Sequence, residues 1–339
     1  MDDPTTPPLI ADLSPVHKFQ RPRFEDLPLR LGDPKCSAWG LWGDEDELGT
    51  LNILTPDVVA RASREARNGI VVPLSLPLES PLLPMNPRRT PCAHNIIAKG
   101  YANDDEVHLN TQSSSHWDGL RHYPYQIESA RRYYNGVTTE DISGPKRNSK
   151  IGVQIDMARH GIVGRGVLLD WREYAKRKGI KYSPFASHAI PLKQLLEVAE
   201  SQRVDFLPGD ILLIRTGWTE EYDKLTNDEK MHLGRREQRC FVGVEASEEM
   251  IRWHWDRQFA AVASDTNAYE VWGLPSKPFG VACHEVFLSG WGMPIGEVWD
   301  LERLSTTCQA TGRWTFLLTS SPLNLDSGVA SPSNAIAIF

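Results

Sequence analysis

The chain has 339 residues, a mass of 38.2 kDa and a net charge of −7, and 40% of its residues are hydrophobic. It is long enough to bury a sizeable core as a globular protein. The acidic balance argues against a nucleic-acid partner, which normally requires a basic face. No apolar run approaches the roughly 18 residues that span a bilayer, so we expect no membrane association.

The N-terminus and the cysteines bear on the compartment. The first residues are acidic and rich in proline rather than basic and then apolar, so no secretory signal is visible and we expect a soluble, cytoplasmic protein. The five cysteines are scattered and form no CxxC pair, which argues against a disulfide framework and a thiolate zinc cluster. Cys283 adjoins His284, but neighbours on a strand point to opposite faces, so we interpret Cys283 as a buried structural thiol.

The N-terminal part of the chain predicts an arm and then a folded domain. Residues 1–38 are rich in proline and read as an extended arm, whereas residues 39–339 read as one domain without a visible linker. Thr55 as N-cap and Pro56 at the first helical position predict a helix over 56–68, and a strand follows over 70–78.

Farther along the chain, short apolar runs bounded by glycine and proline predict alternating strands and helices. We interpret the glycine-rich segment 161–166 as a turn before a strand. The predicted strands are 166–170, 211–215, 260–264, 314–318 and 335–339, and the predicted helices are 192–202 and 248–257, the latter capped by Ser247. Because strands outnumber helices, we expect a mixed α/β domain.

The segment 112–125, which reads QSSSHWDGLRHYPY, concentrates polar groups that suit a metal site. Gln112, His116, Asp118 and His122 lie at offsets 0, 4, 6 and 10. All four offsets are even, so on a strand or strand-like loop the four side chains would share one face. Imidazole and carboxylate are good ligands for Zn²⁺ or Mn²⁺, and a further histidine could transfer protons. A surface loop with two incidental histidines is the alternative.

Further ligands would have to come from the downstream segment 282–297, which contains His284 and Glu297. Glu297 ends a glycine-flanked apolar piece, where a carboxylate is costly unless it is paired or coordinated. On pattern alone, Glu297 could equally be an exposed loop residue and His284 a core histidine.

Three other residues near these motifs are candidates for substrate binding. Trp117 and Trp42 could form walls of a pocket for a ring-bearing substrate, although most of the 11 tryptophans should be core residues. Arg121 could hold a substrate carboxylate through its planar guanidinium, or could form a surface ion pair.

The segment 112–122 resembles the metal-binding motif His-x-Gly-Thr-His-x-Asp-x-Pro-x-His of the cyclase-like metal-dependent hydrolases, which include bacterial-type kynurenine formamidase and isatin hydrolase. The resemblance extends through most of the chain. It includes the segments 42–52 (WGDEDELGTLN), 166–170 (GVLLD), 208–218 (PGDILLIRTGW), 265–266 (DT) and 292–297 (GMPIGE), while 328–334 (GVASPSN) resembles the long fungal branch.

This resemblance implies a swivelling β/β/α fold, with a mixed sheet and flanking helices, that assembles as a homodimer or homotetramer. It implies one or two divalent ions, Zn²⁺ or Mn²⁺, with proton transfer by His122; the implied ligands are His116, Asp118, His284 and Glu297. Two positions depart from the motif, because Gln112 replaces its first histidine and Leu120 its proline. An amide oxygen is a weaker and harder donor than imidazole, so Gln112 as a ligand would favour Mn²⁺ or Mg²⁺.

Three functional hypotheses follow for a protein that acts on a small molecule. The first is a metal-dependent hydrolase of an amide, cyclic amide or lactone, with His122 or Glu297 transferring the proton. The second is a non-hydrolytic cyclase, dehydratase or isomerase of secondary metabolism with little or no metal, which Gln112 favours. The third is a binding protein that has lost catalysis.

Overall fold

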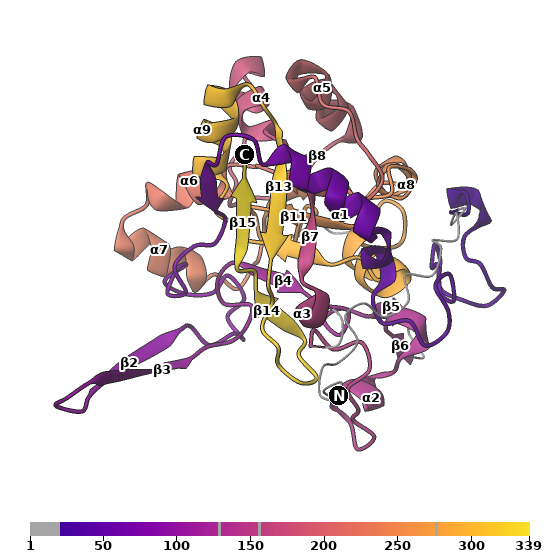
Figure 1. The fold of residues 1–339 in the computed structure, drawn as a ribbon, viewed down its shortest axis with the longest axis horizontal. Coiled ribbons are helices and arrows are strands. Elements are labelled where there is room, and N and C mark those ends of the chain that lie inside the picture. The colour runs from indigo at the N-terminus through magenta and orange to yellow at the C-terminus, as the bar shows by residue number, and fades with distance from the viewer. Residues whose placement is uncertain (1–20, 128–129, 155–156, 275–276) are drawn as a thin grey trace, which may run out of the picture.

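The computed structural model describes residues 21–127, 130–154, 157–274 and 277–339. Nine strands form the central sheet: β1 (Val71–Pro73), β4 (His116–Asp118), β7 (Ile162–Leu169), β9 (Ile211–Ile214), β11 (Ala261–Ser264), β12 (Ile295–Glu297), β13 (Thr315–Ser320), β14 (Ala330–Pro332) and β15 (Ala335–Ile338). Their order is β1-β15-β13-β7-β9-β11-β12-β4-β14, and the sheet is curled and mixed (Figure 1). The predicted mixed α/β fold is therefore confirmed.

Helices flank this sheet (Figure 1). They are α1 (Pro56–Ala62), α2 (Thr139–Ser143), α3 (Met157–His160), α4 (Trp171–Lys178), α5 (Leu192–Gln202), α6 (Trp218–Asp223), α7 (Asn227–Gly234), α8 (Glu248–Asp256) and α9 (Glu302–Thr311), with a π-helix η5 (Glu285–Trp291). The short 3₁₀ turns are η1 (Phe24–Asp26), η2 (Gly49–Ile53), η3 (Ser63–Glu65) and η4 (Tyr134–Gly136). No helix in these four stretches is long and apolar enough to cross a membrane.

Three small two-stranded sheets complete the fold. They pair β2 (Ala93–Ala98) with β3 (Asn103–His108), β5 (Tyr125–Ile127) with β6 (Ala130–Arg132), and β8 (His188–Ile190) with β10 (Val242–Val244). The β2–β3 hairpin projects away from the body of the molecule (Figure 1).

The core lies on both faces of the central parallel strands. All four residues of β9 are buried, as expected for a parallel strand covered on both sides. Leu212 and Ile214 pack into one hydrophobic cluster, whereas Ile211 and Leu213 pack into the other. The alternation of side chains along the strand therefore divides the core into two layers.

Most predicted elements are present, with shifted ends. The helix over 192–202 has its predicted bounds, and Ser247 caps α8 by accepting a hydrogen bond from the Met250 amide. The predicted helix over 56–68 is shorter, and the strand over 70–78 is reduced to β1. The prediction of a turn over 161–166 is wrong, since Ile162 to Gly166 belong to β7. A Cβ atom at Gly166 would lie 2.2 Å from the Phe316 ring, so this glycine allows close packing within the strand.

The predicted N-terminal arm is described only in part, because residues 1–20 lie outside the described residues. The part from residue 21 onward packs on α8. Trp255 Nε1 donates a hydrogen bond of 2.9 Å to the Pro22 carbonyl, and the Arg252 guanidinium lies 4.6 Å from the centre of the buried Phe24 ring.

Candidate metal centre

The pairing of β4 with β12 brings the two halves of the predicted site together. The strands are antiparallel, with His116 opposite Glu297 and Asp118 opposite Ile295. Residues directly opposite each other share a face, and Asp118 lies two residues after His116. His116, Asp118 and Glu297 therefore face the same side of the sheet, and all three are buried.

The His116 ring is oriented by the chain just before it. Its Nδ1 lies 2.7 Å from the Ser114 carbonyl, which can only accept, so Nδ1 carries the proton. In the neutral ring Nε2 offers a lone pair 3.4 Å from Asp118 Oδ1 and 3.5 Å from Glu297 Oε2, and it is buried without a hydrogen bond. Two ligands of a tetrahedral ion with bonds of about 2.0–2.1 Å lie about 3.3 Å apart. The three atoms thus have the spacing of metal ligands.

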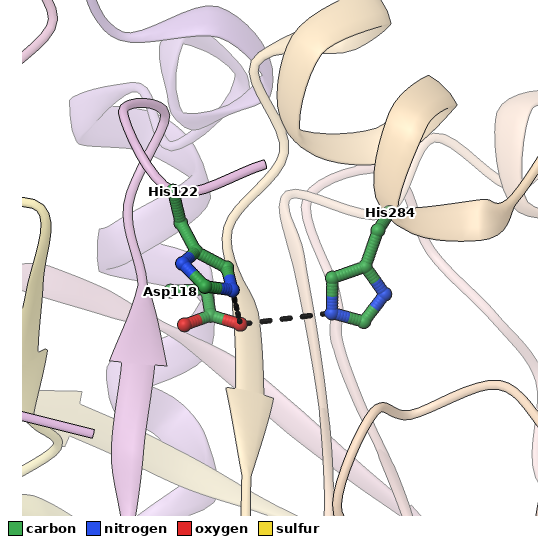
Figure 2. Close-up of side chains that lie close together, drawn as sticks. All are labelled: Asp118, His122 and His284. Atoms are coloured by element: carbon green, nitrogen blue, oxygen red, sulfur yellow. Dashed lines mark ion pairs between the residues drawn. The ribbon is translucent and has the colours of Figure 1, made fainter. Parts of the chain in front are cut away.

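The other oxygen of Asp118 faces a second group of ligands. Asp118 Oδ2 lies 3.7 Å from His122 Nε2 and 3.6 Å from His284 Nε2, as Figure 2 shows, and it has no hydrogen-bond partner. Both His116–Asp118–Glu297 and Asp118–His122–His284 could hold an ion. Because Asp118 belongs to both groups and offers each a different oxygen, the geometry has room for one bridged pair of ions or for a single ion.

His284 is held from both sides by carboxylates. It directly precedes η5, its Nδ1 lies 2.8 Å from Glu270 Oε2, and its Nε2 lies 3.0 Å from Glu297 Oε1. A carboxylate behind a histidine is a common arrangement around metal ligands, where it fixes the ring and the tautomer. Glu270 was not predicted from the sequence. Cys283, in contrast, is buried in a hydrophobic cluster, and burial raises the pKa of its thiol, which confirms its interpretation as a structural residue.

Burial and neighbouring charges shift the pKa values of the three histidines in opposite directions. Burial opposes charge on His116, but Asp118 and Glu297 outweigh it and raise its pKa to about 9. Burial likewise opposes charge on His284, and Glu270 leads the carboxylates that raise its pKa well above the usual value. Burial instead lowers the pKa of His122 to about 4, despite the opposing effect of Asp118. His122 is therefore a neutral base at neutral pH.

The two carboxylates of the cluster are ionised. Burial opposes the ionisation of Glu297, yet its histidine neighbours outweigh this effect and lower its pKa to about 2. For Asp118, His122 and His116 likewise outweigh burial and lower the pKa well below the usual value. A divalent cation would compete with the protons on the histidines for these negative charges.

Gln112 contacts the cluster through its amide group. Its Nε2 lies 2.5 Å from Asp118 Oδ1 and 3.1 Å from His122 Nδ1. A carboxylate only accepts hydrogen bonds, so the NH₂ group of Gln112, and not its oxygen, faces Asp118. In this arrangement Gln112 holds the carboxylate in place.

The prediction that the four side chains of the 112–122 segment share one face of a strand is only partly correct. Gln112, His116, Asp118 and His122 do converge, but only His116 and Asp118 lie on a strand. Gln112 belongs to a turn before β4, and His122 to a turn after it, in which the His122 amide donates to the Gly119 carbonyl. The even offsets therefore correctly predicted that the four side chains converge. The strand positions only His116 and Asp118, and turns position Gln112 and His122.

Trp117 and Arg121, two of the residues predicted to bind substrate, are both buried and make contacts within the fold. Trp117 has an exposed fraction of 0% and points to the opposite face of β4, where its Nε1 donates to Ser320 Oγ and its ring packs edge-on against Trp299. Strand alternation between His116 and Asp118 explains this orientation. Arg121 has an exposed fraction of 2%, and its guanidinium donates to main-chain carbonyls of Asp141, Ile142, Asn148 and Lys150.

Trp42 was the third substrate-binding prediction. It is half-buried in a turn over 40–43 and is not among the residues that line the cavity beside the cluster. Its role stays a prediction.

A cavity of about 230 Å³ opens beside the cluster and is lined by His122, His284 and Glu297. Its aromatic walls are Tyr123, Phe241 and Trp272, and its polar lining includes two arginines, Arg89 and Arg239. None of these five residues was predicted from the sequence, because no motif or common spacing connects them.

The model of the Cyclase family ("Putative cyclase") matches residues 52–271. The chain belongs to this family. The family resemblance predicted from the segment 112–122 is therefore confirmed.

Solved structures share the same fold. A crystal structure described as a novel cyclase matches with a TM-score of 0.76 and 29% identity, over 89% of this chain and 99% of that one. Isatin hydrolase A from Labrenzia aggregata, bound to benzyl benzoate, has a TM-score of 0.54 and 17% identity, over 85% of this chain and 98% of that one. Isatin hydrolase A from Ralstonia solanacearum has a TM-score of 0.56 and 17% identity, over 84% of this chain and 97% of that one. No match to a curated protein was found.

Proposed function

We propose that this protein is a metal-dependent hydrolase that opens an amide, cyclic amide or lactone bond of a small, ring-bearing molecule. The observation that carries the proposal is a pair of buried atoms without hydrogen bonds, His116 Nε2 and Asp118 Oδ2, inside a cluster of histidines and carboxylates. A buried polar atom left unpaired costs about 1–3 kcal/mol, and a bound cation would satisfy both atoms.

The donor set suits Zn²⁺ or Mn²⁺, which accept imidazole nitrogen and carboxylate oxygen. His116, Asp118 and Glu297 would hold an ion, and His284 would contribute to a second position with the other oxygen of Asp118. When bound, such an ion lowers the pKa of water and polarises a carbonyl.

His122 is the residue best suited to transfer the proton. It lines the cavity, and its pKa of about 4 leaves it neutral and able to accept a proton from water at neutral pH. It would then return that proton to the leaving nitrogen or oxygen, a step worth about 10²–10⁴-fold in rate. Glu297 is less suited to this role, because its pKa is lowered to about 2 and both its oxygens face histidines.

The cavity and the relatives support a ring-bearing substrate. Tyr123, Phe241 and Trp272 supply flat apolar walls beside His122. The isatin hydrolases share the fold at 17% identity, so their activity suggests the class of reaction without fixing the substrate.

The test replaces Asp118 with Ala and measures the metal content by elemental analysis, together with turnover of model amides and lactones. We expect both to fall, since Asp118 contributes to both groups of ligands. Asp105→Ala is a matched control, because it removes a carboxylate from the exposed β3 strand. Undiminished activity in Asp118→Ala would contradict the proposal.

A non-hydrolytic reaction is the second candidate, and the contacts of Gln112 favour it. An amide that already satisfies Asp118 Oδ1 and touches His122 could organise an acid–base pair with little or no metal. Incorporation of ¹⁸O from solvent water into the product separates the two reactions. Hydrolysis transfers the label, whereas isomerisation does not require it.

A further inference from the structure

Two arginines line the cavity beside the candidate metal site. Arg89 and Arg239 line it together with His122, His284 and Glu297. Within the described residues, neither guanidinium forms an ion pair with a carboxylate, although ion pairs are common elsewhere on the surface. Arg89 is half-buried and Arg239 is exposed, and the unusual feature is that the two arginines share one cavity.

The two side chains are held in different ways. Arg89 Nη1 donates a hydrogen bond of 3.1 Å to the Gln112 carbonyl, which fixes it beside the loop that precedes β4. Arg239 lies with its guanidinium 6.0 Å from the centre of the Trp272 ring, within the range of a cation–π contact. Both contacts leave most of the N–H groups of each guanidinium available to a ligand.

Their charges also act on each other. Partial burial of the guanidinium is the chief cause that lowers the pKa of Arg239; Arg89 and Arg88 lower it further, whereas Tyr123 and Glu297 oppose the shift. Like charges that share a partly enclosed space repel, and an anion placed between them would remove the repulsion. A carboxylate matches the planar fork of a guanidinium better than a spherical ion does.

We propose that the substrate of this site carries a carboxylate on a flat ring, and that Arg89 and Arg239 bind this carboxylate. The inference rests on the proposed hydrolase function for the position of the reacting bond. Arg239 is exposed and Glu297 is buried, so the cavity leads from the arginines inward to the metal cluster. The ring would lie against Trp272 and Tyr123, and its amide or lactone carbonyl would face His122 and Glu297.

The direct test is calorimetric titration of the full-length protein, dialysed against chelator, with benzoate and with uncharged benzamide. Benzoate and benzamide have similar shapes and differ in charge. Removing metal excludes the other group that could bind a carboxylate strongly. We expect benzoate to bind about tenfold more tightly than benzamide. Arg239→Gln and Arg89→Gln should each remove about tenfold of the benzoate affinity, which corresponds to about 1.4 kcal/mol.

Arg88→Gln is the matched control, since Arg88 adjoins Arg89 in sequence and does not line the cavity. It should change benzoate affinity by less than twofold. Equal binding of benzoate and benzamide, binding of neither at millimolar concentration, or an equal loss in Arg88→Gln would overturn the proposal. Equally tight binding of inorganic phosphate would also overturn it, because it would indicate a general anion site.

A kinetic arm separates this inference from the proposed reaction. With metal-loaded protein, Arg239→Gln should raise KM for 2-acetamidobenzoate about tenfold relative to the change for neutral acetanilide, with little change in kcat. If neither compound is hydrolysed but benzoate still binds through the arginines, the hydrolase proposal fails and the carboxylate site stands. If both are hydrolysed without preference for the carboxylate, only the carboxylate site fails.

Discussion

Replacing Gln112 with Glu would place a second carboxylate against Asp118. Gln112 Nε2 lies 2.5 Å from Asp118 Oδ1, so the change exchanges an N–H donor for a like charge. Two unit charges about 3 Å apart repel by about 5 kcal/mol at an effective dielectric constant of 20. Protonation of the new glutamate limits this penalty to about 4 kcal/mol at pH 7.5, since its unfolded-state pKa is about 4.3. We therefore expect the metal-free Gln112→Glu protein to be destabilised by up to about 4 kcal/mol.

The stability of the Gln112→Glu protein should depend on pH, because protonation of the new glutamate removes the repulsion. The folded-state pKa of the new glutamate is raised, so the destabilisation grows as pH rises from the unfolded-state value toward the raised one. Lowering the pH from 7.5 should restore about 1.4 kcal/mol of the free energy of unfolding per unit. Urea unfolding in the presence of a chelator measures this loss.

Stabilisation by added metal should differ between the Gln112→Glu variant and the unaltered protein. Excess Zn²⁺ or Mn²⁺ should stabilise Gln112→Glu more than it stabilises the unaltered protein, because the cation neutralises the added carboxylate. Gln112→Met removes the amide without adding charge and serves as the control. Equal stability of Gln112→Glu and the unaltered protein in chelator, or equal stabilisation of both by metal, would refute the reasoning.

Three further predictions concern other residues. His122→Gln should lower kcat by about 10²–10⁴ in metal-loaded protein, and an unchanged kcat would exclude its role in proton transfer. His254 is buried with its Nδ1 2.8 Å from the Met250 carbonyl and its Nε2 2.8 Å from the Tyr269 hydroxyl, and burial lowers its pKa to about 4. Because the unfolded state binds this proton first, stability should fall by about 3 kcal/mol as pH drops from 6.5 to 4, and His254→Phe should flatten that part of a urea-midpoint profile. Trp117→Ala should cost about 3–5 kcal/mol in the free energy of unfolding, whereas Trp42→Ala at its half-buried turn should cost much less.

The parts of the fold that were predicted have strong local signals. The helix over 192–202 has apolar residues at helical spacing, and β9 is a continuous apolar run that follows a Pro-Gly turn. The β2–β3 hairpin was not predicted. Asn103 to His108 are exposed throughout and mostly acidic or polar, so this strand has no apolar face and hence no alternation to detect. Its pairing depends on main-chain hydrogen bonds between the two strands, which leave no side-chain pattern.

The residues of the candidate site also differ in whether the sequence carried a signal for them. His116, Asp118 and His122 were predicted because they lie close together in sequence, whereas the prediction of His284 and Glu297 depended on the family resemblance. Glu270, Arg89 and Arg239 were missed, since each lies in a separate loop and reaches the site only through the packing of distant strands.

The position of the candidate metal ligands His116 and Asp118 depends on the apolar face of the strand that carries them, β4. In β4 the alternation that directs His116 and Asp118 to the site sends Trp117 to the opposite side, where its ring centre lies 4.7 Å from that of Trp299. Across the sheet from Trp117 is Gly296, where a Cβ atom would lie 2.6 Å from Ala263 and 2.8 Å from Trp299. Only a glycine leaves room there for the tryptophan pair. A three-residue strand with a charged face can be buried because this packing compensates on the other face, so a Gly296→Ala change should displace Glu297 and weaken metal binding without touching a ligand.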